Sequence, residues 1–328
     1  MVQLAGVDRL TLASFGGVVL IGGLNGIAVK ATVGELEPLW SAAVRFIAAS
    51  ILMLGLVTYG RRTLPRGRSL GGAALYGAVG IGAGYGFLYT ALQSVPAGTA
   101  MLLIALAPLF TFGLAIAHRQ EAFRFQGLVG ALVALGGVGI VTADQLSANV
   151  PAVGLLLAVL ATVCLAESSV IAKWIPRSDP FGTNVVAMGA GGGLLLVGSA
   201  LGAERWTVPV ETDTWVALGY LALLGSVVMF ALFLFTLGRW TASAVSYVSL
   251  LMPMVTIVAA AILTAERPSV AFLLGGAVVL VGVYVGAFLH WPARTSASAA
   301  PECLPIDACA DAAAPVPAPA APGGRSPG

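Results

Sequence analysis

Residues 105–121 read ALAPLFTFGLAIAHRQE, and residues 250–266 read LLMPMVTIVAAAILTAE. Both stretches belong to apolar segments with a central proline, and both end on a glutamate. Pro108 and Pro253 are 145 residues apart, and the same spacing separates Glu121 from Glu266. This agreement indicates that the chain contains one structural unit twice.

The repeat continues on both sides of these stretches. Two glycine pairs have the same spacing, and a four-residue segment and a lysine recur at nearly the same spacing: Gly130 and Gly275, Gly137 and Gly282, Phe87–Thr90 and Phe233–Thr236, and Lys30 and Lys173. Each half therefore ends with a proline-containing apolar helix, a glutamate and a glycine-rich helix.

The composition indicates which solvent surrounds these helices. Of the 328 residues, 59% are hydrophobic and 9% are charged, and the mean hydropathy is +0.97. Soluble domains carry about 25% charged residues, so this chain lacks the charges that a soluble surface needs. A soluble enzyme and a nucleic-acid-binding protein are therefore excluded, and a net charge of +2 indicates no polyanionic partner.

A membrane-spanning helix needs about 20 mostly apolar residues. Segments of this kind recur ten times along the chain. They are Leu10–Ala28, Pro38–Tyr59, Leu70–Leu92, Ala97–Ala117, Phe125–Thr142, Ala152–Ala172, Phe181–Leu201, Thr214–Gly238, Thr241–Thr264 and Ser269–Leu289. We expect an all-α integral membrane protein with about ten transmembrane helices: a cytoplasmic N-terminus over residues 1–9, a first five-helix repeat over 10–142, a second over 152–289 and a disordered cytoplasmic tail over 292–328.

The distribution of basic residues predicts the orientation. With the N-terminus inside, twelve Lys and Arg residues fall on the cytoplasmic side and three on the outer side, as the positive-inside rule requires. Both termini are then cytoplasmic in a multi-pass protein of the plasma membrane. Five spans per half is an odd number, so the second half enters the membrane in the opposite sense. Such inverted-topology repeats are typical of secondary transporters.

Several short motifs resemble one transporter family. They are Gly23-Leu-Asn-Gly-Ile-Ala-Val-Lys30, Pro38-Leu39 with Val44-Arg45-Phe46, Ala107-Pro108-Leu109-Phe110 followed by Glu121, and Met252-Pro253 followed by Ala265-Glu266-Arg267. Over residues 10–290 the chain resembles the EamA-type ten-helix members of the drug/metabolite transporter superfamily. The ending His118-Arg-Gln-Glu121 departs from the commoner pattern of a small residue, Gly and Glu. The resemblance implies export of small metabolites or drugs through a central cavity.

Polar side chains at membrane depth are candidates for lining that cavity. Hydroxyl residues near Pro253 fall on one helical stripe, which faces either a cavity or a neighbouring helix. Prolines leave the carbonyl four residues earlier without its usual donor, so they form hinges or packed kinks. The candidate set for the substrate cavity is Asn25, Arg45, Tyr85, Pro108, Glu167, Ser246, Tyr247, Ser249, Pro253 and Thr256. Tyr89 and Gln93 are expected at the outer interface, where aromatic belts are common.

Two charged residues within spans leave alternatives open. Glu167 must be protonated, paired or exposed to water, and the first outcome makes it a candidate for proton coupling. Arg45 either extends to the outer headgroups or binds a substrate carboxylate. Glycines at helical spacing indicate close packing of helices: Gly22 and Gly26, Gly80 and Gly84, Gly189 and Gly193, and Gly282 and Gly286.

The sequence therefore predicts a secondary transporter that exports a small organic metabolite, such as an amino acid, by alternating access. Multidrug efflux of lipophilic compounds is the alternative, and a membrane scaffold or a lipid-modifying enzyme is the competing class. No catalytic motif, metal-ligand pattern or cofactor motif occurs, and Cys164, Cys303 and Cys309 form no disulfide or metal framework. The expected partners are a small-molecule substrate and the lipid bilayer, and the expected state is a monomer, with a dimer as the alternative.

Overall fold

The computed structural model describes residues 8–95, 100, 103–142, 151–176, 178–264 and 270–288. Regular structure within these ranges is entirely helical, with no strand. The tail predicted to be disordered over 292–328, and Glu266, lie outside the described residues.

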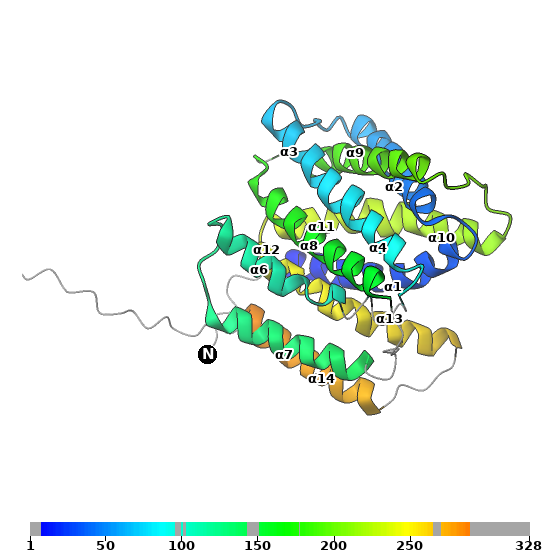
Figure 1. Cartoon of the computed structure of the whole chain (residues 1–328). Coiled ribbons are helices and arrows are strands. Elements are labelled where there is room, and N and C mark those ends of the chain that lie inside the picture. The colour runs from blue at the N-terminus through cyan, green and yellow to red at the C-terminus, as the bar shows by residue number, and fades with distance from the viewer. Residues whose placement is uncertain are drawn as a thin grey trace, which may run out of the picture. The chain divides into compact units, whose positions relative to one another are not determined.

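The described helices account for the ten predicted spans (Figure 1). They are α1 Arg9–Val33, α2 Pro38–Tyr59, α3 Arg68–Tyr76, η1 Gly77–Tyr85, α4 Gly86–Ala91, α6 Ala107–Ala117, α7 Phe125–Thr142, α8 Ala152–Trp174, α9 Pro180–Leu201, α10 Thr212–Ala222, η3 Leu223–Val228, α11 Met229–Leu237, α12 Ala242–Ser246, α13 Val248–Thr264, α14 Val270–Val283 and η4 Tyr284–Phe288. Five helical stretches are long and apolar enough to cross a bilayer, and shorter apolar helices supply the rest. The predicted fold class, an all-α membrane protein of two repeats, is confirmed.

The third span of each half contains a π-helical segment. In the first half η1 lies between α3 and α4, and in the second half η3 lies between α10 and α11. A π-helix bonds each N–H five residues back and occurs mostly as a short insertion in an α-helix. Both halves therefore have a locally widened helix in the same span.

The fourth span differs from the single helix expected over Ala97–Ala117. Helix α6 begins at Ala107, and residues 105–106 form a turn before it. Pro108 consequently lies in the first turn of α6, where a helix needs no backbone donor. The expectation of a mid-helix proline is wrong for Pro108, whereas Pro253 does lie inside helix α13.

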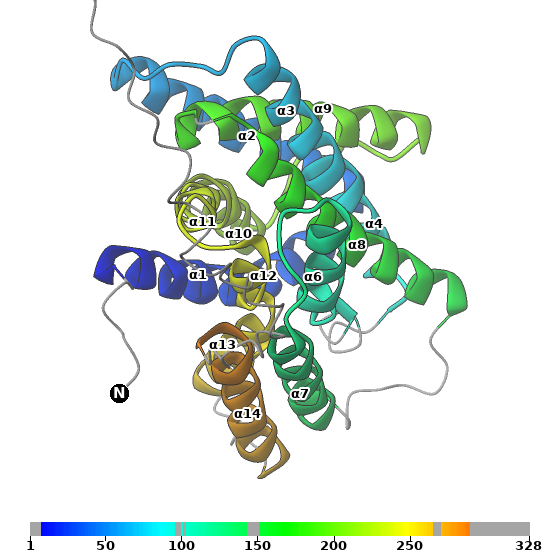
Figure 2. The same ribbon diagram turned by 90° about the vertical axis from the view of Figure 1, so that its left-hand side faces the viewer.

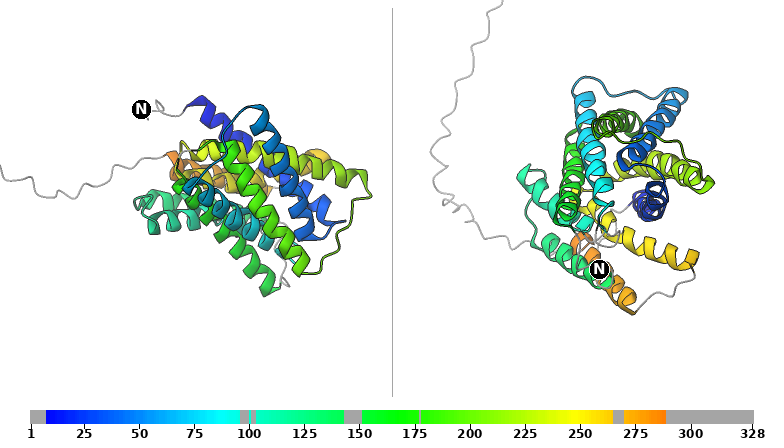
Figure 3. Two further views of the ribbon diagram at one scale, coloured as in Figure 1. Left: turned by 90° about the horizontal axis from the view of Figure 1, so that it is seen from above. Right: turned by 45° about the vertical axis from the view of Figure 1, so that its right-hand side comes forward.

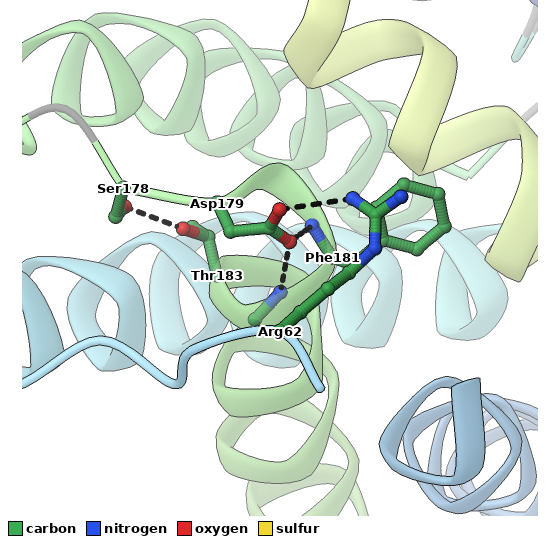
Figure 4. A network of polar contacts seen from close by, with 6 residues as sticks. Arg62, Ser178, Asp179, Phe181 and Thr183 are labelled. Atoms are coloured by element: carbon green, nitrogen blue, oxygen red, sulfur yellow. Dashed lines mark hydrogen bonds and ion pairs between the residues drawn. The ribbon is translucent and has the colours of Figure 1, made fainter. Parts of the chain in front are cut away.

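Helices α2 and α9, the second spans of the two halves, pack antiparallel. At one end of this pair, Glu204 lies just after the end of α9. Its carboxylate accepts hydrogen bonds from the backbone N–H groups of Leu39 (3.1 Å) and Trp40 (2.8 Å) at the start of α2. At the other end, Arg62 after α2 forms an ion pair of 2.9 Å with Asp179, which caps α9 (Figure 4). Equivalent helices thus run in opposite directions, as an inverted repeat requires.

These contacts also define the two ends of the bundle. We call one the Glu35 end, where residues 34–37 join α1 to α2 and residues 202–211 join α9 to α10. We call the other the Arg62 end, where residues 60–67 join α2 to α3 and residues 175–179 join α8 to α9.

The fifth spans, α7 and α14, form a second antiparallel pair. They lie side by side at one edge of the bundle in Figures 1 and 2, and Figure 3 gives two further views. Glycines bring the two backbones together: a Cβ on Gly130 would lie 2.4 Å from Gly286, and one on Gly137 would lie 2.7 Å from the Gly275 carbonyl. Because neither side can accept a methyl group, these glycines fix the spacing of the pair.

The contacts between spans follow the same symmetry. Helix α8, the first span of the second half, packs against three elements of the first half: α6, η1 and α4. In the first half, α1 packs against α13 and against α10 and α11 of the second half. Each half therefore inserts its first span between the third and fourth spans of the other.

Candidate functional site

A cavity of about 550 Å³ lies inside the bundle and is lined by helices of both halves; we call it the chamber. The first half contributes residues of α1, α2, α3, η1, α4 and α6, and the second contributes residues of α8, α11, α12 and α13. Most of the lining is aliphatic or aromatic. Its polar members are Asn25, Arg45, Tyr76, Tyr85, Tyr89, Thr111, Ser168, Ser169, Ser246 and Ser249.

The ten residues proposed from the sequence divide evenly. The chamber lining includes Asn25, Arg45, Tyr85, Ser246 and Ser249. It does not include Pro108, Glu167, Tyr247, Pro253 and Thr256. Only the first five can therefore contact a solute in the chamber in this conformation.

Arg45 on α2 extends into the bundle and is 1% exposed. Its Nε donates to the Ser226 hydroxyl at 2.9 Å, and its Nη2 donates to the Gly225 carbonyl at 2.9 Å. Its Nη1 donates to the Tyr89 hydroxyl at 3.2 Å. Three bonds from two other spans thus hold the guanidinium in place, so the side chain does not reach the headgroups.

Among the described residues of the chamber lining, Arg45 is the one that carries a charge. Within the described part of the chain, no Asp or Glu forms an ion pair with it. A guanidinium stays protonated in proteins, and burying an unpaired charge is costly. The chamber therefore has a fixed positive charge without a carboxylate partner.

Aromatic rings surround this guanidinium. Its Cζ lies 4.8 Å from the Phe46 ring centre and 5.5 Å from that of Tyr85. Tyr85 and Tyr89 are 6.4 Å apart between ring centres. Tyr89 is 1% exposed and lines both the chamber and a second cavity at the Glu35 end, so its ring faces the interior of the bundle. Its predicted depth, near the outer interface, stays a prediction. Its spacing of four residues from Tyr85, which puts both on one helical face, was the signal for a common position.

Asn25 on α1 packs against the π segment η3. Its Nδ2 donates to the Gly225 carbonyl at 3.3 Å, and a Cβ on Gly225 would lie 2.3 Å from the Asn25 Oδ1. The other half repeats this contact, because a Cβ on Gly80 in η1 would lie 2.6 Å from the Ser168 Oγ on α8. Asn25 and Ser168 are 143 residues apart, as Lys30 and Lys173 are. The repeat spacing would thus have identified Ser168, which the sequence analysis missed.

Four serines on α8 and around the junction of α12 and α13, together with Thr111 on α6, supply the aliphatic hydroxyl groups of the described lining. The Thr111 hydroxyl is buried and has no hydrogen bond within the described residues. Ser168 and Ser169 both donate to the Leu165 carbonyl, at 2.8 Å and 3.2 Å. Ser246 donates to the Ser243 carbonyl at 2.7 Å, and Ser249 donates to the Ser246 carbonyl at 2.8 Å. Each serine hydroxyl has one proton, which these bonds use, so the serine oxygens can offer only lone pairs to a solute.

The hydroxyl stripe predicted around Pro253 is divided because the helix is interrupted at Tyr247, between α12 and α13. The Thr256 hydroxyl donates to the Gly23 carbonyl at 2.6 Å, and the Tyr247 hydroxyl donates to the Gly127 carbonyl at 3.1 Å. Both groups connect neighbouring spans, α13 to α1 and the α12–α13 junction to α7. Their hydrogen bonds account for their position away from the chamber.

Glu167 lies on α8 near the Arg62 end and contacts the end of α6. Its Oε1 is 3.4 Å from the His118 Nε2, and its Oε2 is buried with no hydrogen bond within the described residues. The His118 Nδ1 is 2.9 Å from the Leu114 carbonyl, which can only accept, so this nitrogen carries a proton. A neutral His118 would then direct the lone pair of Nε2 at a carboxylate. A hydrogen bond between the two side chains therefore needs one additional proton, on His118 or on Glu167.

A second cavity, of about 570 Å³, lies at the Glu35 end and shares Val33, Tyr89 and Leu92 with the chamber. We call this second cavity the vestibule. Its polar and charged lining residues include Glu35, Glu37, Gln93, Arg205 and Thr207. Hydrogen bonding to Thr214, and then to the backbone N–H groups of Val210 and Glu211, holds the pKa of Glu35 below its ordinary value.

The sequence matches a known family model in two blocks. Residues 12–143 and 152–287 each match the EamA-like transporter family. A probable amino-acid metabolite efflux pump of Escherichia coli (strain K12) is 28% identical over 287 residues, which cover 84% of this chain and 94% of the relative. A probable terminal-alkyne amino-acid exporter of Streptantibioticus cattleyicolor is 30% identical over 220 residues, or 67% of this chain and 73% of the relative.

Another relative is the inner membrane transporter YedA of Escherichia coli, which is uncharacterized and 30% identical over 213 residues, or 64% of this chain and 68% of the relative. A solved crystal structure has the same fold, with a TM-score of 0.72 at 20% identity over 85% of this chain and 97% of the other. The predicted class, a membrane transporter and not an enzyme, is confirmed by the family match. The chain belongs to the EamA-like transporter family.

Proposed function

We propose that this protein exports a small organic metabolite, an amino acid or a related compound, across the plasma membrane by alternating access. The observation that carries the proposal is a chamber of about 550 Å³ that holds one buried, unpaired cation, Arg45. This volume lies within the range of about 300–1,000 Å³ found for small-molecule sites. Two relatives, a probable amino-acid metabolite efflux pump and a probable terminal-alkyne amino-acid exporter, support the same substrate class.

Alternating access has support in the pairing of the halves. The chamber lies between two inverted repeats, whose exchange of conformations would open it to one side and then to the other. Contacts between halves occur at both ends, such as Arg62 with Asp179 at one and Trp40 with Glu204 at the other. Opening either end would require breaking such contacts. We propose a monomer as the working unit because one chain encloses the chamber.

The orientation belongs to the same proposal. The count of Lys and Arg residues assigns the Arg62 end to the cytoplasm, with both termini there, and the Glu35 end to the outside. The polar vestibule next to the chamber would then be its outer exit. A fluorescent reporter that matures only in the cytoplasm, fused to the C-terminus, tests this: a dark fusion at normal expression rejects the orientation.

The decisive experiment is efflux from loaded cells. Cells with and without the protein are loaded with a panel of labelled amino acids and related metabolites, and the loss of each compound is followed over time. We expect faster loss of at least one compound with the protein present. The predominantly apolar lining favours lipophilic drugs as the second candidate, so the panel includes ethidium. Faster loss of ethidium alone would support drug efflux, and no change for any compound would reject transport.

We also propose that Glu167 couples export to protons, together with His118. The pair connects the end of α6 in one half to α8 in the other, at 3.4 Å, and its contact depends on one added proton. Loss of the contact would remove one of the links between the halves at this point. The Glu167→Gln variant should fold normally and lose the dependence of efflux on pH, and an unchanged pH profile would reject the coupling.

A further inference from the structure

We propose that the chamber is polarised along its length and binds an organic carboxylate end-on, with the carboxylate on Arg45 and with N–H or O–H donors at the far end on the serine oxygens of α8, α12 and α13. This inference deepens the proposed export function, on which it rests, because it assigns the chemical class of the solute to named groups in the chamber.

The first support is the number of unused donors on Arg45. A guanidinium has five N–H groups, and three of them donate to Ser226, Tyr89 and Gly225. One N–H remains on each terminal nitrogen, since Nη1 and Nη2 each make one hydrogen bond. Two N–H groups on the two terminal nitrogens are what a carboxylate needs for a two-point contact.

The second support is the charge balance. Arg45 has the one formal charge of the chamber lining, and within the described residues no carboxylate neutralises it. A solute with a carboxylate at this point would replace the missing partner, whereas a cationic solute would add to the repulsion. The charge therefore selects for anionic head groups in a low-dielectric space.

The third support is the acceptor character of the opposite region. The hydroxyl protons of Ser168, Ser169, Ser246 and Ser249 are all donated to backbone carbonyls, so their oxygens can only accept. An ammonium or hydroxyl group is the complementary partner of these four oxygens. The Thr111 hydroxyl on α6, which has no hydrogen bond within the described residues, can both donate and accept. The two regions thus differ in the kind of hydrogen bond that they can make.

The distance between the regions defines the shape of the solute. Tyr89, which holds Arg45, and Gly80, which contacts Ser168, lie nine residues apart on the same span. At the α-helical rise of 1.5 Å per residue this is at most about 13 Å along the helix, because the π-helical part of the span rises less per residue. An ammonium group on the carbon next to the carboxylate cannot reach that far. The donors that meet the serine oxygens must therefore be at the distal end of an extended solute.

Three probes of matched length test this: 6-aminohexanoate, hexanoate and hexylammonium, measured by equilibrium binding to the purified full-length protein in nanodiscs. We expect 6-aminohexanoate to bind at least tenfold more tightly than either of the others. The Arg45→Met variant should bind 6-aminohexanoate and hexylammonium alike. The Ser168→Ala/Ser249→Ala double variant should remove the preference for 6-aminohexanoate over hexanoate.

Matched controls keep the outcome clear. The Arg66→Met variant removes an exposed arginine of the loop after α2 and should bind all three probes as the wild type does. Arg45→Lys, which keeps the charge and loses the two-point contact, should lie between wild type and Arg45→Met, and melting curves verify that each variant is folded. Equal binding of hexylammonium and 6-aminohexanoate to the wild type, or an Arg45→Met variant that keeps wild-type selectivity, would overturn the inference. If the selectivity holds but no compound leaves loaded cells, the export proposal fails alone.

Discussion

The Gly77→Ala variant tests how closely the two halves approach each other. Gly77 begins η1, and a Cβ built there would lie 2.0 Å from the Ala187 carbonyl oxygen and 2.5 Å from its carbonyl carbon on α9. An ordinary contact needs about 3.5 Å, so η1 and α9 would have to separate by more than about 1 Å. Because the obstructing atoms are backbone, no side-chain rotation relieves the clash.

The expected magnitude follows from this separation. Overpacking in a well-packed interior costs about 1–3 kcal/mol, and a backbone clash belongs at the upper end of that range. The better helix propensity of alanine returns up to about 1 kcal/mol. The net loss of stability is then about 2 kcal/mol, which for a chain of this length corresponds to a melting temperature lower by roughly 3 °C.

The assay is thermal unfolding of the purified protein in one detergent at one concentration, followed by intrinsic fluorescence. The control is Gly71→Ala on α3, in the same span, where a Cβ would meet nothing within 4 Å. This variant should melt at the wild-type temperature or slightly above it. If Gly77→Ala and Gly71→Ala melt together, the close contact of η1 with α9 does not limit packing, and the reasoning is refuted.

Three further predictions concern polar contacts. The fold lowers the pKa of Glu35, so the stability that its carboxylate contributes is present at neutral pH and is lost as the pH falls below the ordinary value of 4.5. In the Glu35→Gln variant the melting temperature should therefore depend less on pH over that range. An acid profile unchanged from that of the wild type would contradict this. Asp179→Ala removes the cap of α9 and the partner of Arg62, so the protein should lose about 1 kcal/mol in thermal unfolding, whereas Asp179→Asn should retain most of it. His118→Gln should reduce the pH dependence of efflux as Glu167→Gln does, and opposite effects would rule out a shared proton.

The spans were predictable from the sequence because membrane insertion depends on length and hydropathy, which are local properties. The inverted repeat was predictable from residue spacing, as with Pro108 and Pro253. The π segments and the turn at 105–106 were not, because they depend on how each helix meets its neighbours. At η3, for example, the Gly225 carbonyl accepts from both Arg45 and Asn25, two groups that lie 180 and 200 residues away.

For the candidate site, too, the sequence predicted features that depend on local spacing but not those that depend on tertiary contacts. A polar stripe in an apolar helix predicts an inward face, and Ser246 and Ser249 do line the chamber. The stripe was drawn for a continuous helix, however, and the interruption at Tyr247 changes the register beyond it. The glycine pairs gave a similarly mixed result. A Cβ built on Gly282 would lie 2.4 Å from the Ala134 backbone nitrogen on α7, whereas a Cβ built on Gly193 would meet nothing within 4 Å. A spacing predicts a shared face, and only the tertiary structure decides what that face contacts.

The two halves have similar structures, so a solute can be bound in one orientation only at positions where their residues differ. Counted from Pro38 and Pro180, which begin α2 and α9, the position of Arg45 corresponds to Ala187, and both side chains are buried. The corresponding positions of α2 and α9 thus differ in charge, and only the one on α2 places a cation beside the chamber. The proposed exchange of conformations requires that the halves be alike, and the proposed binding of a solute in one orientation requires that they differ at Arg45. An alternating-access chamber that binds a carboxylate end-on needs both properties at once.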